Sequence, residues 1–372
     1  MKWKEVLEIK SGKNQKDVAD INGCYPIYGS GGIIGYSKEY LCPAGTTIIG
    51  RKGTINSPLY VNEPFWNVDT AFGLIPSQQL VSKYLYYFCC YFNFKALDKS
   101  TTIPSLAKRD LENVEMPVPP LDEQSRIVAR IEELFSELDK AVDTLKTIKE
   151  QLEVYRQAVM KDAFQEKESI IRLGDAIEKP HYGTSKKCDY PCTANSTAVL
   201  RIPNIDTKNG RVDSSDLKYA EFNEKELEQL SLKNGDILII RSNGSISLVG
   251  SSAIIRKCDT DKTYAGYLMR LRILNKEKLL PQYLLYYLSS PDARRYIESV
   301  AKSTSGVNNI NSQEISKLCV PLSSIEKQEK TVAEIEMKLS VYHEIEKSVD
   351  TVLAQADAMR QSILKQAFEG KL

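Results

Sequence analysis

The chain has 372 residues, of which 42% are apolar and 27% are charged, and its formal net charge is +1. This length is enough for two or three domains that each bury a core, and the composition excludes a disordered or collagen-like chain. No run approaches the roughly 20 apolar residues of a membrane span, and the N-terminus lacks the apolar centre of a signal peptide. A cytoplasmic protein is therefore expected.

The first 118 residues are predicted to form an α+β domain that begins with its strands. Short β-rich runs alternate with Gly-rich turns in CYPIYGSGGIIGY and TTIIGRKGTINSPLYV, and a helical pattern follows near residues 79–95. The run Gly29-Ser30-Gly31-Gly32 has neither the spacing of a dinucleotide-binding fingerprint nor the lysine of a phosphate loop. We expect it to let two strands turn tightly.

Residues 119–168 are predicted to form a long helix that starts after Pro119-Pro120, because proline is tolerated at a helix start but not inside one. Apolar residues recur there in steps of four and three, which indicates the seam of a left-handed coiled coil. The predicted seam consists of Ile127, Ile131, Leu134, Leu138, Ala141, Leu145, Ile148, Leu152, Tyr155 and Val159. From its first to its last residue this seam would extend about 48 Å at ~1.5 Å per residue.

Residues 169–322 are predicted to form a second α+β domain, and residues 323–372 a second long helix. The run DILIIRSNGSISLVGSSAII repeats the strand-and-turn style of the first domain, and a helical pattern follows near residues 281–301. The seam of the second helix is less regular and consists of Thr331, Ile335, Lys338, Tyr342, Ile345, Val349, Val352, Ala356, Met359 and Ile363. The simplest arrangement pairs the two helices antiparallel within the chain, since each seam needs an apolar partner. The alternative is that the seams pair with other subunits.

The two halves of the chain are related by an internal repeat. A shift of 204 residues places Arg156 on Arg360 and Gln124 on Gln328, and it aligns residues 117–164 with 321–368 without a gap. Upstream of these segments, KYLYYF corresponds to QYLLYYL, and GTTIIGRKGTI resembles GDILIIRSNGSI. Each half therefore has the plan of a globular head, a proline-containing hinge and a long helix.

Eight cysteines are scattered along the chain, as expected of reduced thiols rather than a disulfide framework. The nearest approach to a metal-ligand cluster is His181, Cys188 and Cys192, which lacks the tight Cys-x-x-Cys pair of a structural zinc site. We expect neither a metal nor a cofactor.

The small net charge hides a contrast between heads and helices. Residues 1–116 and 170–319 together carry a net charge of +7, whereas residues 117–169 and 320–372 together carry −6. Basic heads on acidic helices fit heads that face phosphates.

Four features of the sequence resemble the specificity subunits of type I restriction–modification systems. They are the repeated plan of head and helix, the hinge from Pro119 to Gln124 (PPLDEQ), the helix end RQAVMKDAF with its copy ending QAFEGKL, and the phrase YPIYGSGGIIGYSKEYL followed by IIGRKGTI. The likeness covers essentially the whole chain. The second hinge departs from the pattern, because PLSSI from Pro321 has lost the second proline and the Leu-x-Glu. We therefore expect the second docking surface to be less well defined than the first.

The resemblance implies a non-catalytic subunit without a cofactor that recognises DNA. Two target-recognition domains would each read one half of a split DNA sequence, and the helix pair would set the gap and dock two methyltransferase (modification) subunits. Restriction subunits would join the full complex, and no membrane would be involved.

Side chains that follow strand ends, and small polar loops with one cation, are the predicted DNA contacts. Arginine can bind guanine edges bidentately, asparagine can read adenine, and lysine loops can hold phosphates. The predicted contacts are Arg51, Lys52, Thr54, Asn56, Lys99, Thr101, Arg201, Asn204, Arg241, Ser242, Asn243, Ser245, Lys302, Ser303 and Asn308.

Two other function classes compete with DNA reading. A protein-binding coiled-coil scaffold would show the same helices, so the helices alone do not separate it from a DNA reader. An adenine methyltransferase would need an Asn-Pro-Pro-aromatic motif, which the sequence lacks. Two histidines, neither near an obvious nucleophile, leave little for hydrolytic chemistry.

Overall fold

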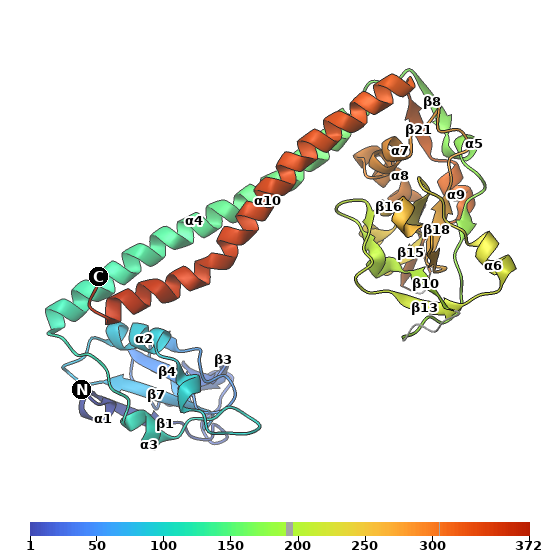
Figure 1. Cartoon of the computed structure of the whole chain (residues 1–372). Coiled ribbons are helices and arrows are strands. Elements are labelled where there is room, and N and C mark those ends of the chain that lie inside the picture. Colours follow the sequence, from blue (N-terminus) through green and yellow to red (C-terminus); the bar gives the residue numbers. More distant parts are fainter. Residues whose placement is uncertain (191–195, 305) are drawn as a thin grey trace. The chain divides into compact units, whose positions relative to one another are not determined.

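The computed structural model describes residues 1–190, 196–304 and 306–372, without side chains for residues 302–304. The chain divides into two compact units, residues 1–147 with 349–372 and residues 148–348. Each unit holds one head and part of both long helices, α4 (Leu121–Asp162) and α10 (Ile325–Phe368) (Figure 1). Within the described ranges, no helix is both long and apolar enough to span a bilayer.

The first head contains two sheets. Its elements are α1 (Trp3–Val6), β1 (Leu7–Ser11), β2 (Tyr25–Gly29), β3 (Gly32–Ser37), β4 (Thr46–Gly50), β5 (Leu59–Val61), β6 (Trp66–Asn67), β7 (Ala71–Pro76), α2 (Ser82–Tyr91), η1 (Phe94–Leu97) and α3 (Lys108–Glu112). One sheet is antiparallel with the strand order β1-β7-β4-β5, and the other has the order β3-β2-β6 with β6 parallel to β2. Strand β4 is buried along its whole length because its residues TTIIG are small or apolar.

The second head repeats both sheets. Its first elements are β8 (Ser169–Arg172), α5 (Leu173–Ala176), β9 (His181–Tyr182), β10 (Ser196–Leu200), η2 (Ile202–Asn204), β11 (Ile205–Asp206), β12 (Arg211–Val212), β13 (Lys218–Glu221), α6 (Glu224–Gln229), β14 (Ile237–Ile240) and β15 (Ser242–Asn243). Its later elements are η3 (Ile246–Leu248), β16 (Ser252–Ile254), η4 (Lys257–Asp259), β17 (Thr263–Tyr264), β18 (Leu268–Leu271), α7 (Pro281–Leu288), α8 (Pro291–Val300), β19 (Lys302–Thr304), β20 (Val307–Asn309), α9 (Ser312–Ser316) and β21 (Cys319–Leu322).

The strand orders of the two heads correspond one to one. The order β9-β18-β14-β16 matches β1-β7-β4-β5, and β13-β10-β17, with β17 parallel to β10, matches β3-β2-β6. The main difference is the connection after β10, which is longer than the turn after β2 and contains η2 and the β11–β12 hairpin. The predicted α+β class and the predicted internal repeat are confirmed.

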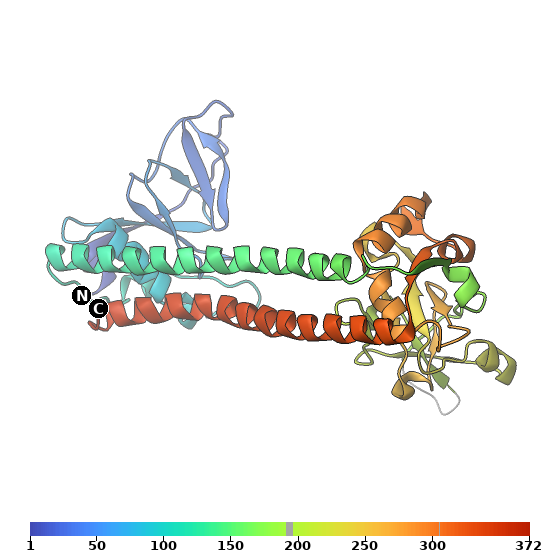
Figure 2. The ribbon, with the colours of Figure 1, turned by 90° about the horizontal axis from the view of Figure 1, so that it is seen from above.

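The long helices run antiparallel within each unit. In the first unit, Leu364 and Ala367 near the end of α10 share a hydrophobic core with Ile127 and Ile131 near the start of α4. In the second unit, Ile335 and Leu339 near the start of α10 share a core with residues 160 and 164 at the end of the first helix region. Figures 1 and 2 show α4 and α10 side by side. The predicted antiparallel pair is confirmed.

The buried seam differs from the predicted one at five of its twenty positions. Positions 131, 138, 145, 152 and 159 of α4, and 335, 342, 349, 356 and 363 of α10, are buried or half-buried as expected. Positions 127, 134, 148, 331 and 338 are also buried or half-buried. The exceptions are Ala141, Tyr155, Ile345, Val352 and Met359, which are exposed. At these five places the next residue in the chain is less exposed, namely Val142, Arg156, Glu346, Leu353 and Arg360.

Two residues next to the predicted seam contact the heads. Residues three and four positions after a core position both lie on the same helix face, so the sequence pattern alone does not choose between them. Phe135 packs against Tyr87 of the first head with ring centroids 5.8 Å apart, and Leu339 joins the core of the second head. Contacts with the heads therefore add Phe135 and Leu339 to the buried face of the helices.

A buried glutamine fixes each head to its helix in the same way. Gln124 is fully buried, accepts a hydrogen bond from the Val81 amide at 2.8 Å and donates to the carbonyls of Gln79 and Pro119. The bonds to Val81 and Gln79 connect the start of α4 to the segment that precedes α2, and the bond to Pro119 fixes the hinge before α4. The internal repeat therefore extends to hydrogen bonds, because Gln328 makes the same three.

The second junction has equivalent partners. Gln328 is also fully buried, accepts from the Leu280 amide at 2.9 Å and donates to the carbonyls of Lys278 and Ser323. A buried glutamine side chain is tolerated at both junctions because its two N–H donors and its oxygen acceptor are all paired.

Replacing Gln124 by alanine should lower the free energy of unfolding by about 2–4 kcal/mol, since one amide and two carbonyls lose their partner in a buried place. Gln328→Ala should have an effect of similar size. Urea denaturation measures both, with the exposed helix residue Gln157→Ala as control. A loss below about 0.5 kcal/mol would show that water replaces the glutamine.

Candidate nucleic-acid interface

Arg51 of the first head lies directly after the buried strand β4. Its amide donates to the Thr70 carbonyl at 2.8 Å, and its own carbonyl accepts from the Leu106 amide at 2.9 Å. Its guanidinium Nη1 donates to the Asp69 carbonyl at 3.4 Å, and its Cζ lies 5.6 Å from the centroid of the Phe72 ring. The backbone of Arg51 is thus fixed on both sides, while its side chain stays half-exposed.

Arg241 of the second head has the same surroundings after the equivalent strand β14. Its amide donates to the Tyr267 carbonyl at 2.9 Å, and its carbonyl accepts from the Ile310 amide at 2.9 Å. Its Nη1 donates to the Gly266 carbonyl at 3.2 Å, and its Cζ lies 4.5 Å from the centroid of the Tyr182 ring. The two heads therefore place an arginine between equivalent backbone partners, while the neighbouring rings come from different strands, β7 in the first head and β9 in the second.

In the second head, Arg241 lines a cavity of about 570 Å³ with a mostly apolar floor. Cationic side chains surround this floor, and they come from four separate parts of the chain. The lining consists of Thr184, Ser185, Lys186, Cys188, Arg201, Ile202, Pro203, Lys218, Arg241, Ser242, Ala265, Gly266 and Tyr267. We call it the basic groove.

Some cations of the basic groove have acidic partners. Arg201 pairs with Asp216 at 2.9 Å, and Lys186 pairs with Glu226 at 2.7 Å. Asp216 also accepts a hydrogen bond from the Tyr190 hydroxyl; this bond, followed by the one from Arg201, lowers the pKa of the Asp216 carboxyl. The carboxylate therefore stays ionised at neutral pH and holds Arg201 at the rim of the groove.

Two guanidinium N–H groups in the groove are unpaired. The Nε atoms of Arg201 and Arg241 are buried from solvent and have no hydrogen-bond partner among the described residues. A buried donor without an acceptor costs stability, and an atom that is closed to solvent is reached by a ligand only when its side chain moves. Phosphate oxygens and the acceptor edges of bases supply acceptors for guanidinium N–H groups.

Other predicted contacts of the second head gather beside Arg241. Strand β15 carries Ser242 and Asn243 and pairs with β20, where Asn308 donates its side-chain amide to the Gly244 carbonyl at 2.9 Å. The Asn243 side chain accepts from the Ser245 amide at 2.8 Å. These polar residues shape the turn after Arg241.

Three further predicted contacts of the second head, Lys302, Ser303 and Asn204, are not placed beside Arg241 in this way. Lys302 and Ser303 lie in β19, which pairs with β20, but their side chains are outside the described part of the structure. Asn204 is 1% exposed, and its side chain is fully used by bonds to Arg201, Asp213 and Asp216. The predicted contact between Asn204 and DNA is corrected, because this residue closes the η2 turn.

In the first head, the segment with Lys99 and Thr101 runs beside the turn after Arg51. The backbones of Lys52 and Ser105 form an isolated antiparallel β-bridge, and the Gly53 amide donates to the Pro104 carbonyl at 2.9 Å. Lys52, Thr54 and Thr101 are exposed there. The structure therefore brings the two predicted stretches of this head together.

Two predicted side chains of the first head already have partners in the chain. Asn56 accepts from the Phe94 amide at 2.8 Å through its side-chain oxygen, and Lys99 pairs with Asp110 at 2.9 Å. Lys99 is exposed and can exchange this carboxylate for a phosphate. The oxygen of Asn56 has a structural task.

The sequence did not indicate Lys186, Lys218 and Tyr267, which line the basic groove. They stand in unrelated stretches, and no repeated phrase or motif marks them. Only the strand order that brings β9, β13 and the turn before β18 together reveals them.

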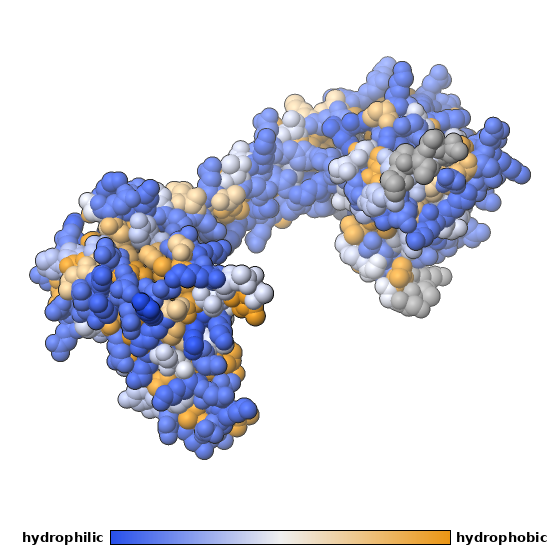
Figure 3. Space-filling model, turned by 60° about the horizontal axis from the view of Figure 1, so that its bottom comes forward, coloured by the Kyte–Doolittle hydropathy of each residue, from blue (hydrophilic) through white to orange (hydrophobic). Residues whose placement is uncertain are grey.

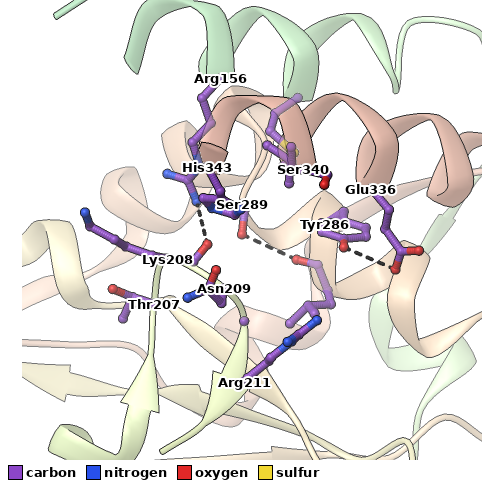
Figure 4. Close-up of a pocket in the computed structure, with 14 residues that line it drawn as sticks. Arg156, Thr207, Lys208, Asn209, Arg211, Tyr286, Ser289, Glu336, Ser340 and His343 are labelled. Carbon is purple, nitrogen blue, oxygen red and sulfur yellow. Dashed lines mark hydrogen bonds between the residues drawn. The ribbon is translucent and has the colours of Figure 1, made fainter. Parts of the chain in front are cut away.

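A second cavity, of about 350 Å³, lies in the second unit where the β11–β12 hairpin meets both helices (Figure 4). Arg156 donates to the Lys208 carbonyl at 3.3 Å, and Lys208 pairs with Glu346 at 3.1 Å. The Tyr286 hydroxyl donates to Glu336 at 3.4 Å, and burial raises the pKa of Tyr286 to about 12. These contacts brace the second head on its helices. Tyr286 stays protonated at neutral pH and acts as a donor.

Within the described ranges, no three His, Cys, Asp or Glu side chains converge as metal ligands. His181 is partly buried, and its Nδ1 lies 3.0 Å from the Tyr264 hydroxyl. Burial, with a smaller effect of Arg270, lowers the pKa of His181. Cys192, the third member of the group with His181 and Cys188, lies outside the described residues.

Comparisons with known proteins agree with this arrangement. Residues 1–154 match the family model described as type I restriction modification DNA specificity domain. The chain is 27% identical to the specificity subunit of the type I restriction enzyme EcoKI of Escherichia coli strain K12 over 347 residues, which cover 87% of this chain and 73% of that one.

Two solved structures share the fold. A chain from a structure on complex assembly and conformational transition of the type I R-M system has a TM-score of 0.75 and 17% identity, covering 100% of this chain and 97% of that chain. The HsdS subunit of Thermoanaerobacter tengcongensis has a TM-score of 0.60 and 16% identity, with coverages of 100% and 96%. The first 154 residues thus match a DNA specificity domain, and the chain, with its two repeated heads and its antiparallel helix pair, resembles the specificity subunits of type I restriction–modification systems.

Proposed function

We propose that this specificity subunit reads a split DNA sequence, with one half-site for each head. The equivalent surroundings of Arg51 and Arg241 carry this proposal, because two heads with the same strand order present the same guanidinium after the same strand. The heads are residues 1–118 and 169–322, and residues 119–168 and 323–372 form the spacer that sets the gap.

The proposed partners on the helices are two methyltransferase subunits, with restriction subunits in the full complex. Exposed apolar side chains on the outer helix faces support such docking. In the second unit these are Val154, Tyr155, Met337, Val341 and Ile345. In the first unit, Val352 and Met359 are exposed in the same way. On the face drawn in Figure 3, hydrophobic patches interrupt a largely hydrophilic surface.

The subunit is proposed to contribute recognition and no chemistry. The basic groove offers cations, hydroxyls and one thiol, and burial raises the pKa of that thiol, Cys188. The thiol therefore lacks the thiolate character of a nucleophile. A complex of this kind acts where the DNA lies, and a cytoplasmic location is part of the proposal.

The test is selection from a random duplex library with the subunit and its methyltransferase partner, followed by sequencing of the retained DNA. The expected result is two fixed half-sites separated by an unspecified gap of constant length, with binding that weakens steeply as salt rises. A continuous motif would contradict the two-head proposal. No enrichment at low salt would favour a protein-binding scaffold.

A further inference from the structure

Strands β2 and β3 of the first head form a hairpin, and the glycines at its tip have free space around them. Strands β2 and β3 pair from Tyr25 with Ser37 at the base to Gly29 with Gly32 at the tip, and Ser30-Gly31 form the turn. Gly32 has φ of 125°, a conformation that favours glycine. A Cβ added at Gly31 or Gly32 would meet nothing within 4 Å. In Figure 2 the blue strands of this head extend away from α4.

Two isoleucines next to this tip are exposed. Ile33 is 53% and Ile34 is 58% exposed, although both are strand residues with large apolar side chains. The strand pairing shifts between Ile27 and Tyr28, so that Ile34 is an extra residue in β3. Such bulges redirect side chains, and here the bulge leaves two neighbouring isoleucines facing solvent.

The tip lies beside the turn that follows Arg51. A Cβ added to Gly53 would lie 3.9 Å from the Ser30 hydroxyl oxygen. In the second head, the residue after the corresponding strand β10 is Arg201, which lines the basic groove together with Arg241. Beside Arg241, the second head thus has the cation of Arg201. Beside Arg51, the first head has the apolar β2–β3 tip at the corresponding place.

We propose that the β2–β3 tip enters the major groove of the first half-site, where Ile33 and Ile34 contact the C5-methyl groups of thymines. This inference rests on the proposed function. The major groove admits a two-stranded β-ribbon, and the thymine methyl is its only apolar feature. The exposed Lys52 on the neighbouring turn supplies the charge that draws the tip to a polyanion.

The chemistry of isoleucine suits this contact. Its branched side chain has few rotamers, so little freedom is lost when it is held against a base. Each buried methyl group should strengthen binding by about three- to fivefold. Since no charge takes part, the contribution should not change with salt.

The experiment removes single methyl groups from the DNA. In the complete complex with the methyltransferase subunits, each thymine of the selected half-sites is replaced by deoxyuridine, one position at a time. At least one replacement in the first half-site should weaken binding three- to fivefold. The double variant Ile33→Ser, Ile34→Ser should bind thymine and deoxyuridine duplexes equally, and its salt dependence should match that of the unchanged protein.

Ile21→Ser is the matched control, because Ile21 is 94% exposed and lies near the base of the same hairpin. It should leave the thymine preference unchanged, and circular dichroism should show all variants folded. If no deoxyuridine weakens binding, or if the first half-site lacks thymine, the proposal is wrong. If the isoleucine variant instead loses the methyltransferase subunits, the tip binds protein. Failure of the proposed function differs from all of these, since no selected half-sites would exist.

Discussion

Replacing Arg51 by alanine should weaken recognition of the first half-site by about 5- to 150-fold and leave recognition of the second intact. The range corresponds to the ~1–3 kcal/mol of a bidentate contact between arginine and guanine. Arg241→Ala should do the reverse. The measurement is competition binding of the complete complex to duplexes in which one half-site at a time is scrambled.

The two arginines allow sharp controls. Arg109→Ala and Arg295→Ala remove exposed arginines from the same heads and should change neither half-site by more than about twofold. Arg51→Lys keeps the charge but not the planar fork, so it should restore general affinity without restoring selectivity. Equal loss at both half-sites after a single substitution would show that the arginines contact phosphates or hold the heads together.

The repeat made the main features of this protein predictable from its sequence. A phrase that occurs twice points to the same structure twice, and Arg51 and Arg241 were predicted because each follows a short apolar strand. The structure adds that their backbone partners are equivalent as well. The antiparallel helix pair followed from the need of each apolar seam for a partner.

What the sequence could not predict depends on contacts between distant segments. Lys186 and Tyr267 reach the basic groove only through the strand order of the second head. Asn204 has the residue type of a base reader, yet three hydrogen bonds make it a structural residue. Leu339, which follows the predicted seam residue Lys338, is buried in the core of the second head. Local patterns do not contain this information.

Lengthening both helices by one heptad should move the half-sites apart without changing either of them. Seven residues inserted after Thr147 in α4 and seven after Ser348 in α10 add about 10.5 Å to each helix, or the rise of about three base pairs. A heptad preserves the seam, so the helices should still pair. Selection should return the original half-sites with a gap longer by about three base pairs, and binding to the original sequence should fall at least a hundredfold.

Inserting the heptad into α4 alone provides the contrast. Seven added residues then have no partner on α10, and the loss of paired apolar surface should destabilise the fold rather than change the gap. Four residues in both helices would break the heptad register and should weaken pairing as well. An unchanged gap after the double heptad insertion, with the protein folded and bound to DNA, would mean that the heads alone set the spacing. A longer gap with the same half-sites would assign spacing to the helices and sequence to the heads, two tasks that can then be changed separately.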